Sequence, residues 1–140
     1  MVISESKKKI TQTKDIANIM KVILSKEEEI DRMKEHCWVV GVNQKNVIQY
    51  IELVSLGSLT CSIVHPREVF RLAIMKGVAS IFLVHNHPSG EVAPPSKEDN
   101  EITERISEAG KIIAIKLLDH VIIGEQESYY SYASMGLIIQ

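Results

Sequence analysis

The chain has 140 residues, of which 45% are hydrophobic and 24% charged, with a formal net charge of −2. This size and apolar content suit a single globular domain with its own core. The charge lacks the basic excess with which nucleic-acid-binding proteins hold phosphates, so direct DNA binding is doubtful. No segment has the length of a membrane span.

The amino terminus predicts a cytoplasmic protein, because residues 1–10 lack the apolar run of a signal peptide. We expect residues 1–10 to be a flexible segment and residues 11–140 to form the single domain. Two cysteines, Cys37 and Cys61, stand in apolar stretches and outside any Cys-x-x-Cys pair. Without a leader sequence, this pattern predicts free buried thiols rather than a disulfide.

The first half of the chain predicts two helices followed by a hairpin. Apolar residues at helical spacing over residues 14–24 indicate an amphipathic helix. Residues 25–28, Ser-Lys-Glu-Glu, resemble a capping box that begins a second, short helix. Residues 37–42 and 47–56 read as strands joined by a polar turn. Residues 59–64 predict a further extended segment.

The second half predicts alternating helices and strands. Residues 66–77 indicate a helix, with proline in its first turn and glycine at its end. Residues 79–84 are continuously apolar, which is typical of a central strand buried on both faces. We expect a helix over residues 96–110, one or two strands within 112–123, and a final short strand within 129–140. The pattern as a whole predicts helices and strands around one sheet.

A candidate metal site follows the central strand. His85 and His87 are two residues apart, so in a strand both imidazoles lie on one face. Pro88 cannot donate to a sheet ladder, which places both histidines at the carboxyl end of the strand, where open α/β sheets bind ligands. Asp99 follows His87 by twelve residues. Two imidazoles and a carboxylate leave one coordination position for water, as catalytic zinc sites do.

The pattern leaves two interpretations of Asp99. Ser96-x-x-Asp99 matches a capping box, in which the carboxylate bonds only to the helix amino terminus. Asp99 also lies on one helical stripe with Ile102, Ile106 and Ala109, which must face the sheet. A buried carboxylate is costly unless it is paired or coordinated, so we favour coordination of a cation shared with the two histidines. Ser96 would then cap the helix and contact substrate.

Hydrolysis at such a site also needs a base that accepts a proton from water. Glu35, between a predicted helix and a predicted strand, is the candidate, with a solvated helix end as the alternative. Spacing alone does not select it from the other glutamates. The alternatives are Glu27, Glu28, Glu29, Glu52, Glu91 and Glu98.

The motif His85-x-His87-Pro88-x7-Ser96-x-x-Asp99, with an upstream glutamate, resembles the JAMM motif of JAB/MPN-domain metalloproteases. Residues 10–138 resemble the RadC family throughout. The segments that carry this resemblance are Lys34-Glu35-His36, Val64-His65-Pro66-Arg67-Glu68-Val69, His85-Asn86-His87-Pro88-Ser89-Gly90 and Leu117-Leu118-Asp119-His120-Val121-Ile122-Ile123-Gly124. The resemblance implies an α/β (α+β) domain, a mixed, curved sheet flanked by helices as in cytidine deaminases. Deaminase chemistry is disfavoured, because its His-x-Glu and Pro-Cys-x-x-Cys motifs are absent.

The resemblance implies a role for each site residue. It makes His85, His87 and Asp99 ligands of one zinc ion per chain, Glu35 the general base and Ser96 a hydrogen-bond donor to the oxyanion. The implied activity is zinc-dependent hydrolysis of peptide or isopeptide bonds in an unidentified protein substrate. The alternative is a metal-binding module that acts in a DNA-repair-associated or protein assembly without significant turnover. A nuclease is disfavoured, because histidines outnumber carboxylates in the predicted site.

The chain departs from the family pattern in two respects. Longer RadC proteins carry an amino-terminal helical domain that resembles a DNA-binding helix-hairpin-helix, and residues 1–10 are too short to correspond to it. The DNA-repair label of the family follows from none of the residues above. Asn86 stands where eukaryotic isopeptidases of this class usually have Ser or Thr, although Asn is usual in RadC-like sequences.

Three further histidines have weaker expectations. Asp119 and His120 would support the site from behind the ligands, with a purely structural role as the alternative. His65 is expected at the start of a helix. His36 is expected at the surface or at a strand edge.

Overall fold

The computed structural model of the chain describes residues 2–3, 8–57 and 64–138. Within them it contains, in chain order, β1 (Val2–Ile3), α1 (Thr13–Ser25), α2 (Glu29–Arg32), β2 (Glu35–Val42), β3 (Ile48–Gly57), α3 (Pro66–Lys76), β4 (Ser80–Asn86), α4 (Lys97–Ile113), β5 (Lys116–Ile123) and β6 (Tyr129–Ser131). No helix in these residues is both long enough and apolar enough to cross a membrane.

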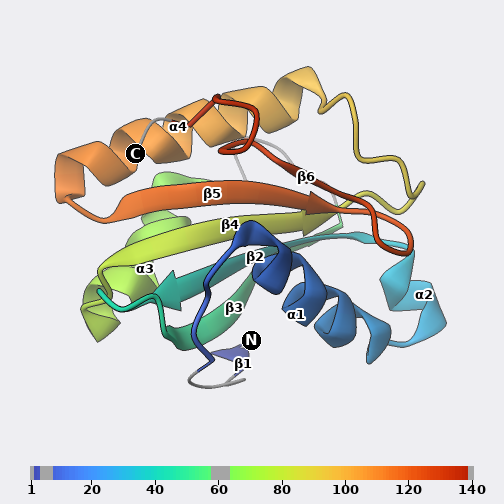
Figure 1. Cartoon of the computed structure of the whole chain (residues 1–140), viewed down its shortest axis with the longest axis horizontal. Helices are drawn as coiled ribbons and strands as arrows, with labels where there is room; N and C mark the ends of the chain where they lie inside the picture. Colours follow the sequence, from blue (N-terminus) through green and yellow to red (C-terminus); the bar gives the residue numbers. More distant parts are fainter. Residues whose placement is uncertain (1, 4–7, 58–63, 139–140) are drawn as a thin grey trace.

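The strands form one six-stranded sheet in the order β1-β3-β2-β4-β5-β6 (Figure 1). The pair β4 and β5 is parallel, whereas the other neighbouring pairs are antiparallel. The sheet is therefore mixed and flanked by helices, which confirms the predicted fold class. The hairpin of β2 and β3 is confirmed as well.

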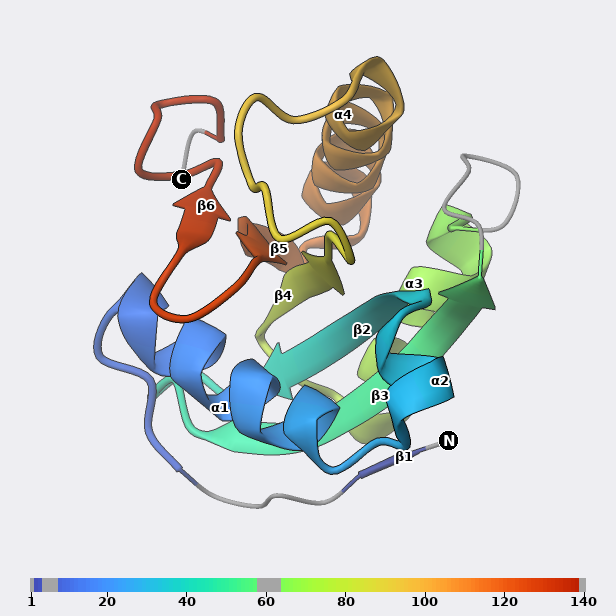
Figure 2. The ribbon, with the colours of Figure 1, turned by 90° about the vertical axis from the view of Figure 1, so that its right-hand side faces the viewer.

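Helices cover both faces of the sheet, α1 on one face and α3 with α4 on the other (Figure 2). Side chains alternate between these faces along each strand. In β4, Ile81 and Leu83 pack in the core beneath α3 and α4, whereas Phe82 and Val84 pack beneath α1. This alternation places His85 on the face that α3 and α4 cover, where it is fully buried.

The second predicted helix begins differently from the prediction. The Ser25 hydroxyl donates to the carbonyl of Val22 within the last turn of α1, at 2.6 Å, so it does not cap α2. The N-cap of α2 is Glu28, whose side chain makes no capping hydrogen bond. The predicted capping box was wrong, because the serine hydroxyl bonds backward into the helix that it ends.

Helix α4 also extends beyond the predicted end at Gly110. It continues to Ile113, and Ala114 at φ 60° forms its carboxyl cap. Gly110 is buried, and a Cβ there would lie 2.5 Å from the carbonyl oxygen of Ile115. The glycine thus allows a close backbone approach rather than ending the helix.

The thiol prediction is testable at one position. Cys37 is fully buried in β2 and is free in the described part of the chain. Cys61 and residues 59–63 of the predicted extended segment lie outside the described residues.

Candidate metal centre

The candidate ligands come from the end of β4 and the first turn of α4. His85 belongs to β4, and the backbone N–H of His87 donates to the carbonyl of Ile123 at 3.1 Å, which continues the parallel ladder by one residue. Asp99 lies in the first turn of α4, on the stripe that faces the sheet. The predicted positions at a strand end and a helix start are therefore correct.

The three side chains converge on one point. Nε2 of His85 lies 3.1 Å from Nε2 of His87 and 3.2 Å from Oδ1 of Asp99. Nε2 of His87 lies 3.2 Å from Oδ2 of Asp99. His85 and Asp99 are buried, whereas the His87 side chain is 19% exposed, so the group opens to solvent beside His87. The geometry confirms that these residues form a cluster that could hold a metal ion.

Hydrogen bonds behind the two imidazoles orient their rings. Nδ1 of His87 lies 2.7 Å from the carbonyl oxygen of Glu91, which can only accept, so this nitrogen carries a proton. Nδ1 of His85 lies 2.7 Å from Nε2 of His120. In each ring Nδ1 is thus engaged, and Nε2, which faces the cluster, is available to a cation or a proton.

These atoms fit a small divalent cation. Lone pairs of two imidazoles and a carboxylate at about 3 Å repel one another unless a proton or a cation lies between them. A tetrahedral zinc ion with bonds of about 2.0–2.1 Å holds its ligand atoms about 3.3 Å apart, close to the observed separations. Two nitrogens and one oxygen, without a thiolate, match catalytic zinc sites rather than closed structural ones.

In the cluster, the Asp99 carboxylate and the His87 imidazole each shift the pKa of the other toward its charged form. Burial acts to raise the pKa of the Asp99 carboxyl, but the imidazoles of His85 and His87 outweigh it and hold this pKa well below 3.8. The hydrogen bond to Asp99 raises the pKa of His87 above 6.5, and the charge of Glu35 acts in the same direction. Without a cation, a proton on His87 thus pairs with the Asp99 carboxylate.

Asp99 takes part in the capping box, and the same carboxylate faces the two histidines. Ser96 is the N-cap of α4, and its Oγ accepts from the backbone N–H of Asp99 at 3.0 Å. Oδ2 of Asp99 in turn accepts from the backbone N–H of Ser96 at 2.9 Å while it faces His87. The capping box therefore fixes the carboxylate in the orientation that the cluster needs. Ser96 itself is exposed.

Glu35 begins β2 on the side of the cluster. Cys37 pairs with His85 in the antiparallel register of β2 and β4, so Glu35 lies two residues further along, beside His87. The electrostatic effect of Glu35 on His87 agrees with this position. The side chain is half-buried.

Asn86 holds the backbone on both sides of Glu35. Its Oδ1 accepts from the N–H of His36 at 2.6 Å, and its Nδ2 donates to the carbonyl of Lys34 at 3.1 Å. His36 is fully buried, so its expected position at the surface was wrong. The buried Asn86 amide requires partners, and the start of β2 provides them.

Asp119 and His120 separate onto opposite faces of β5. His120 reaches His85, whereas Asp119 accepts from Ser131, from the N–H of Ala133 and from Thr13 on the other side of the sheet. Only His120 therefore supports the site. Thr103, which contacts His120, was not singled out from the sequence, although it lies one helical turn after Asp99.

The expectation for His65 is confirmed. It is the N-cap of α3, and its Nδ1 accepts from the backbone N–H of Arg67 at 3.0 Å. This bond accounts for the histidine without a role in the site.

The fold and the cluster define a mixed α/β domain whose His-His-Asp group is compatible with a JAMM-type metal site. Residues 10–137 match the RadC-like JAB domain. The chain belongs to this family, as the resemblance of its motifs predicted.

Curated relatives carry the name UPF0758 protein, which states no activity. One from Caldanaerobacter subterraneus is 48% identical over 130 residues, which cover 88% of this chain and 53% of the relative. One from Clostridium acetobutylicum is 48% identical and covers 93% of this chain and 54% of the relative. One from Methanosarcina mazei is 42% identical, over 97% of this chain and 56% of the relative. The chain thus spans about half the length of the relatives that it matches.

Proposed function

We propose that the protein is a zinc-dependent hydrolase of peptide or isopeptide bonds. His85, His87 and Asp99 would hold the ion. When bound, zinc polarises the scissile carbonyl and lowers the pKa of a coordinated water to about 7. The observation that carries the proposal is the convergence of two imidazole nitrogens and a carboxylate within 4.8 Å of one another at a partly open edge of the sheet.

Glu35 would be the general base. Its half-buried carboxylate lies beside the exposed ligand His87, where an attacking water has access. In this role Glu35 takes a proton from the water as the carbon–oxygen bond forms. It then delivers the proton to the amine nitrogen as the carbon–nitrogen bond breaks.

Ser96 would stabilise the negative charge that develops on the carbonyl oxygen. Its Oγ already accepts the capping bond from Asp99, which leaves its hydroxyl proton free to donate. Ser96 is exposed and lies at the amino terminus of a long helix, where the backbone dipoles also favour negative charge.

The replacement Glu35→Gln tests the proposal, because it keeps the size of the side chain and removes its basicity. We expect cleavage of a peptide library or an isopeptide-linked substrate by the zinc-loaded protein to fall by roughly 10²–10⁴-fold. Bound metal, measured by elemental analysis, should remain at the wild-type level.

Glu98→Gln is the matched control, because Glu98 is exposed in the first turn of α4 and outside the cluster. It should retain wild-type cleavage. The alternative, a metal-binding module without turnover, predicts that wild type and Glu35→Gln both bind metal and show the same background cleavage.

A further inference from the structure

We infer that His120 and Thr103 are positioning residues that keep the proton of His85 on Nδ1, so that Nε2 of His85 is available to a cation. The inference rests on the proposed metal site and adds a device that sets its affinity. It follows from a chain of buried hydrogen bonds that runs from α4 through β5 to β4.

The chain of hydrogen bonds has a fixed direction. The Thr103 hydroxyl donates to the carbonyl of Asp99 at 2.7 Å, and a hydroxyl has only one proton to give. Nδ1 of His120, which contacts the same hydroxyl oxygen, must therefore be the donor in that contact. A neutral His120 then has a lone pair on Nε2, and Nδ1 of His85 must donate to it.

His120 is neutral for a physical reason. It is fully buried, and its two ring nitrogens contact the Thr103 hydroxyl and the His85 imidazole rather than a carboxylate, so burial favours the uncharged ring. A neutral imidazole has one proton, and Thr103 decides which nitrogen carries it. The hydroxyl of Thr103 thus determines the tautomer of a metal ligand that it does not touch.

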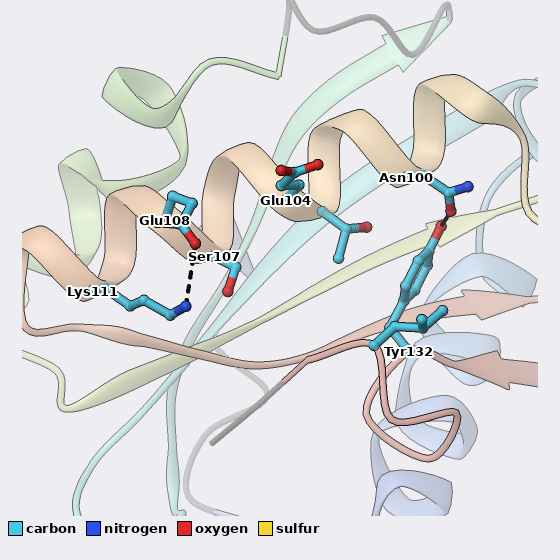
Figure 3. A pocket seen from close by; sticks show the side chains of 8 residues that line it. Asn100, Glu104, Ser107, Glu108, Lys111 and Tyr132 are labelled. Carbon is cyan, nitrogen blue, oxygen red and sulfur yellow. Dashed lines mark hydrogen bonds and ion pairs between the residues drawn. The ribbon is translucent and has the colours of Figure 1, made fainter.

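The ring of Tyr132 keeps His120 in place. The two rings stack with centroids 4.9 Å apart and an angle of 9° between their planes. The Tyr132 hydroxyl donates to Oδ1 of Asn100 at 2.7 Å (Figure 3). Tyr132 also lines a pocket of about 400 Å³ along α4, so its ring separates His120 from that pocket.

This arrangement connects two of the three candidate ligands. Thr103 holds the backbone carbonyl of Asp99 and, through His120, the imidazole of His85. Loss of the hydroxyl removes the acceptor for Nδ1 of His120. The ring of His120 can then carry its proton on Nε2 and drive the proton of His85 toward the metal position.

The pair Thr103→Val and Thr103→Ser tests the inference, because valine keeps the shape and loses the hydroxyl, whereas serine keeps the hydroxyl. We expect zinc affinity, measured by competition with a chelating dye, to fall about 10–100-fold in Thr103→Val. The zinc affinity of Thr103→Ser should stay near that of the wild type.

A second pair covers the case in which a threonine variant fails to fold. In His120→Gln the side-chain oxygen can accept from Nδ1 of His85, whereas His120→Leu cannot, so glutamine should retain more affinity than leucine. If the wild type binds zinc, equal affinity of wild type and Thr103→Val, or of the two His120 variants, would overturn the inference.

The tautomer can be measured without metal or turnover. Long-range proton–nitrogen NMR correlations of the metal-free wild type should show His85 protonated on Nδ1, and a proton on Nε2 instead would refute the relay. If Nδ1 carries the proton but zinc does not bind, the inference stands and the proposed function fails.

Discussion

The protonation states of His87 and Asp99 depend on their contact with each other. In isolation, burial would favour the uncharged forms of both groups. Their hydrogen bond reverses this preference, because it raises the pKa of His87 and helps to lower that of Asp99. A proton and a cation therefore compete for the same position between the two side chains.

The competition predicts how the stability of the metal-free protein depends on pH. Since folding raises the pKa of His87 above 6.5, the stabilisation is complete below pH 6.5 and is lost as the pH rises through the folded value. The unfolding free energy, from urea denaturation in a chelator, should thus decrease above about pH 6.5 with a slope of at most about 1.4 kcal/mol per pH unit.

Asp99→Asn is the variant that isolates this effect, because asparagine preserves the shape and removes the charge. Its pH profile over the same range should be flatter than that of the wild type. Identical slopes in both proteins would mean that His87 and Asp99 do not form the pair. Zinc affinity should increase over the same pH range, since zinc displaces the proton.

At the level of elements, the first turn of α4 combines two roles. Ser96 and Asp99 bond reciprocally as a capping box, and the same carboxylate faces the two histidines. A helix amino terminus leaves backbone N–H groups without partners, and the box satisfies two of them. The start of the helix is thus held in one place, and the Asp99 carboxylate with it.

Substitutions of Ser96 separate capping from catalysis. Ser96→Ala should lower the unfolding free energy by about 1 kcal/mol through loss of the cap. It should also reduce turnover by roughly 10²–10³-fold through loss of a donor to the oxyanion. Ser96→Asp keeps an N-cap acceptor but cannot donate, so it should retain stability, measured by urea denaturation, and lose turnover. Full turnover in Ser96→Asp would limit Ser96 to capping.

At the scale of the whole molecule, the cluster joins elements that are distant in the chain. His85 and His87 follow the central strand, Asp99 begins α4, and His120 lies in β5. A bound ion would therefore connect the sheet to the helix that covers it. Such an ion binds only the folded chain, because the unfolded chain does not hold these groups together.

Metal should consequently stabilise the fold. At a zinc concentration 100 times the Kd, the gain is about 2.7 kcal/mol. For a domain of this size it corresponds to a rise in Tm of roughly 5–10 °C in calorimetry. A chelator should reverse the rise, and Asp99→Asn should show none of it. Glu98→Gln should respond like the wild type, and an equal rise in Asp99→Asn would place the ion elsewhere.

Much of the fold was predictable because its signals are local. The alternation of side chains along a strand placed His85 and His87 on one face, and the helical stripe of Asp99, Ile102 and Ile106 placed the carboxylate toward the sheet. The predictions failed where a residue type has more than one use. Ser25 ended a helix instead of beginning one, and Gly110 allowed close packing instead of ending one.

The sequence by itself determined which residues share a face of their own strand or helix, since those periodicities belong to the backbone. The tertiary structure decided which faces meet. It placed Glu35 beside His87 by the register of β2 against β4, and it turned the His120 face of β5, rather than the Asp119 face, toward His85. It also brought Thr103 to His120. These contacts depend on how distant segments pair and pack, which the spacing of residues along one segment does not encode.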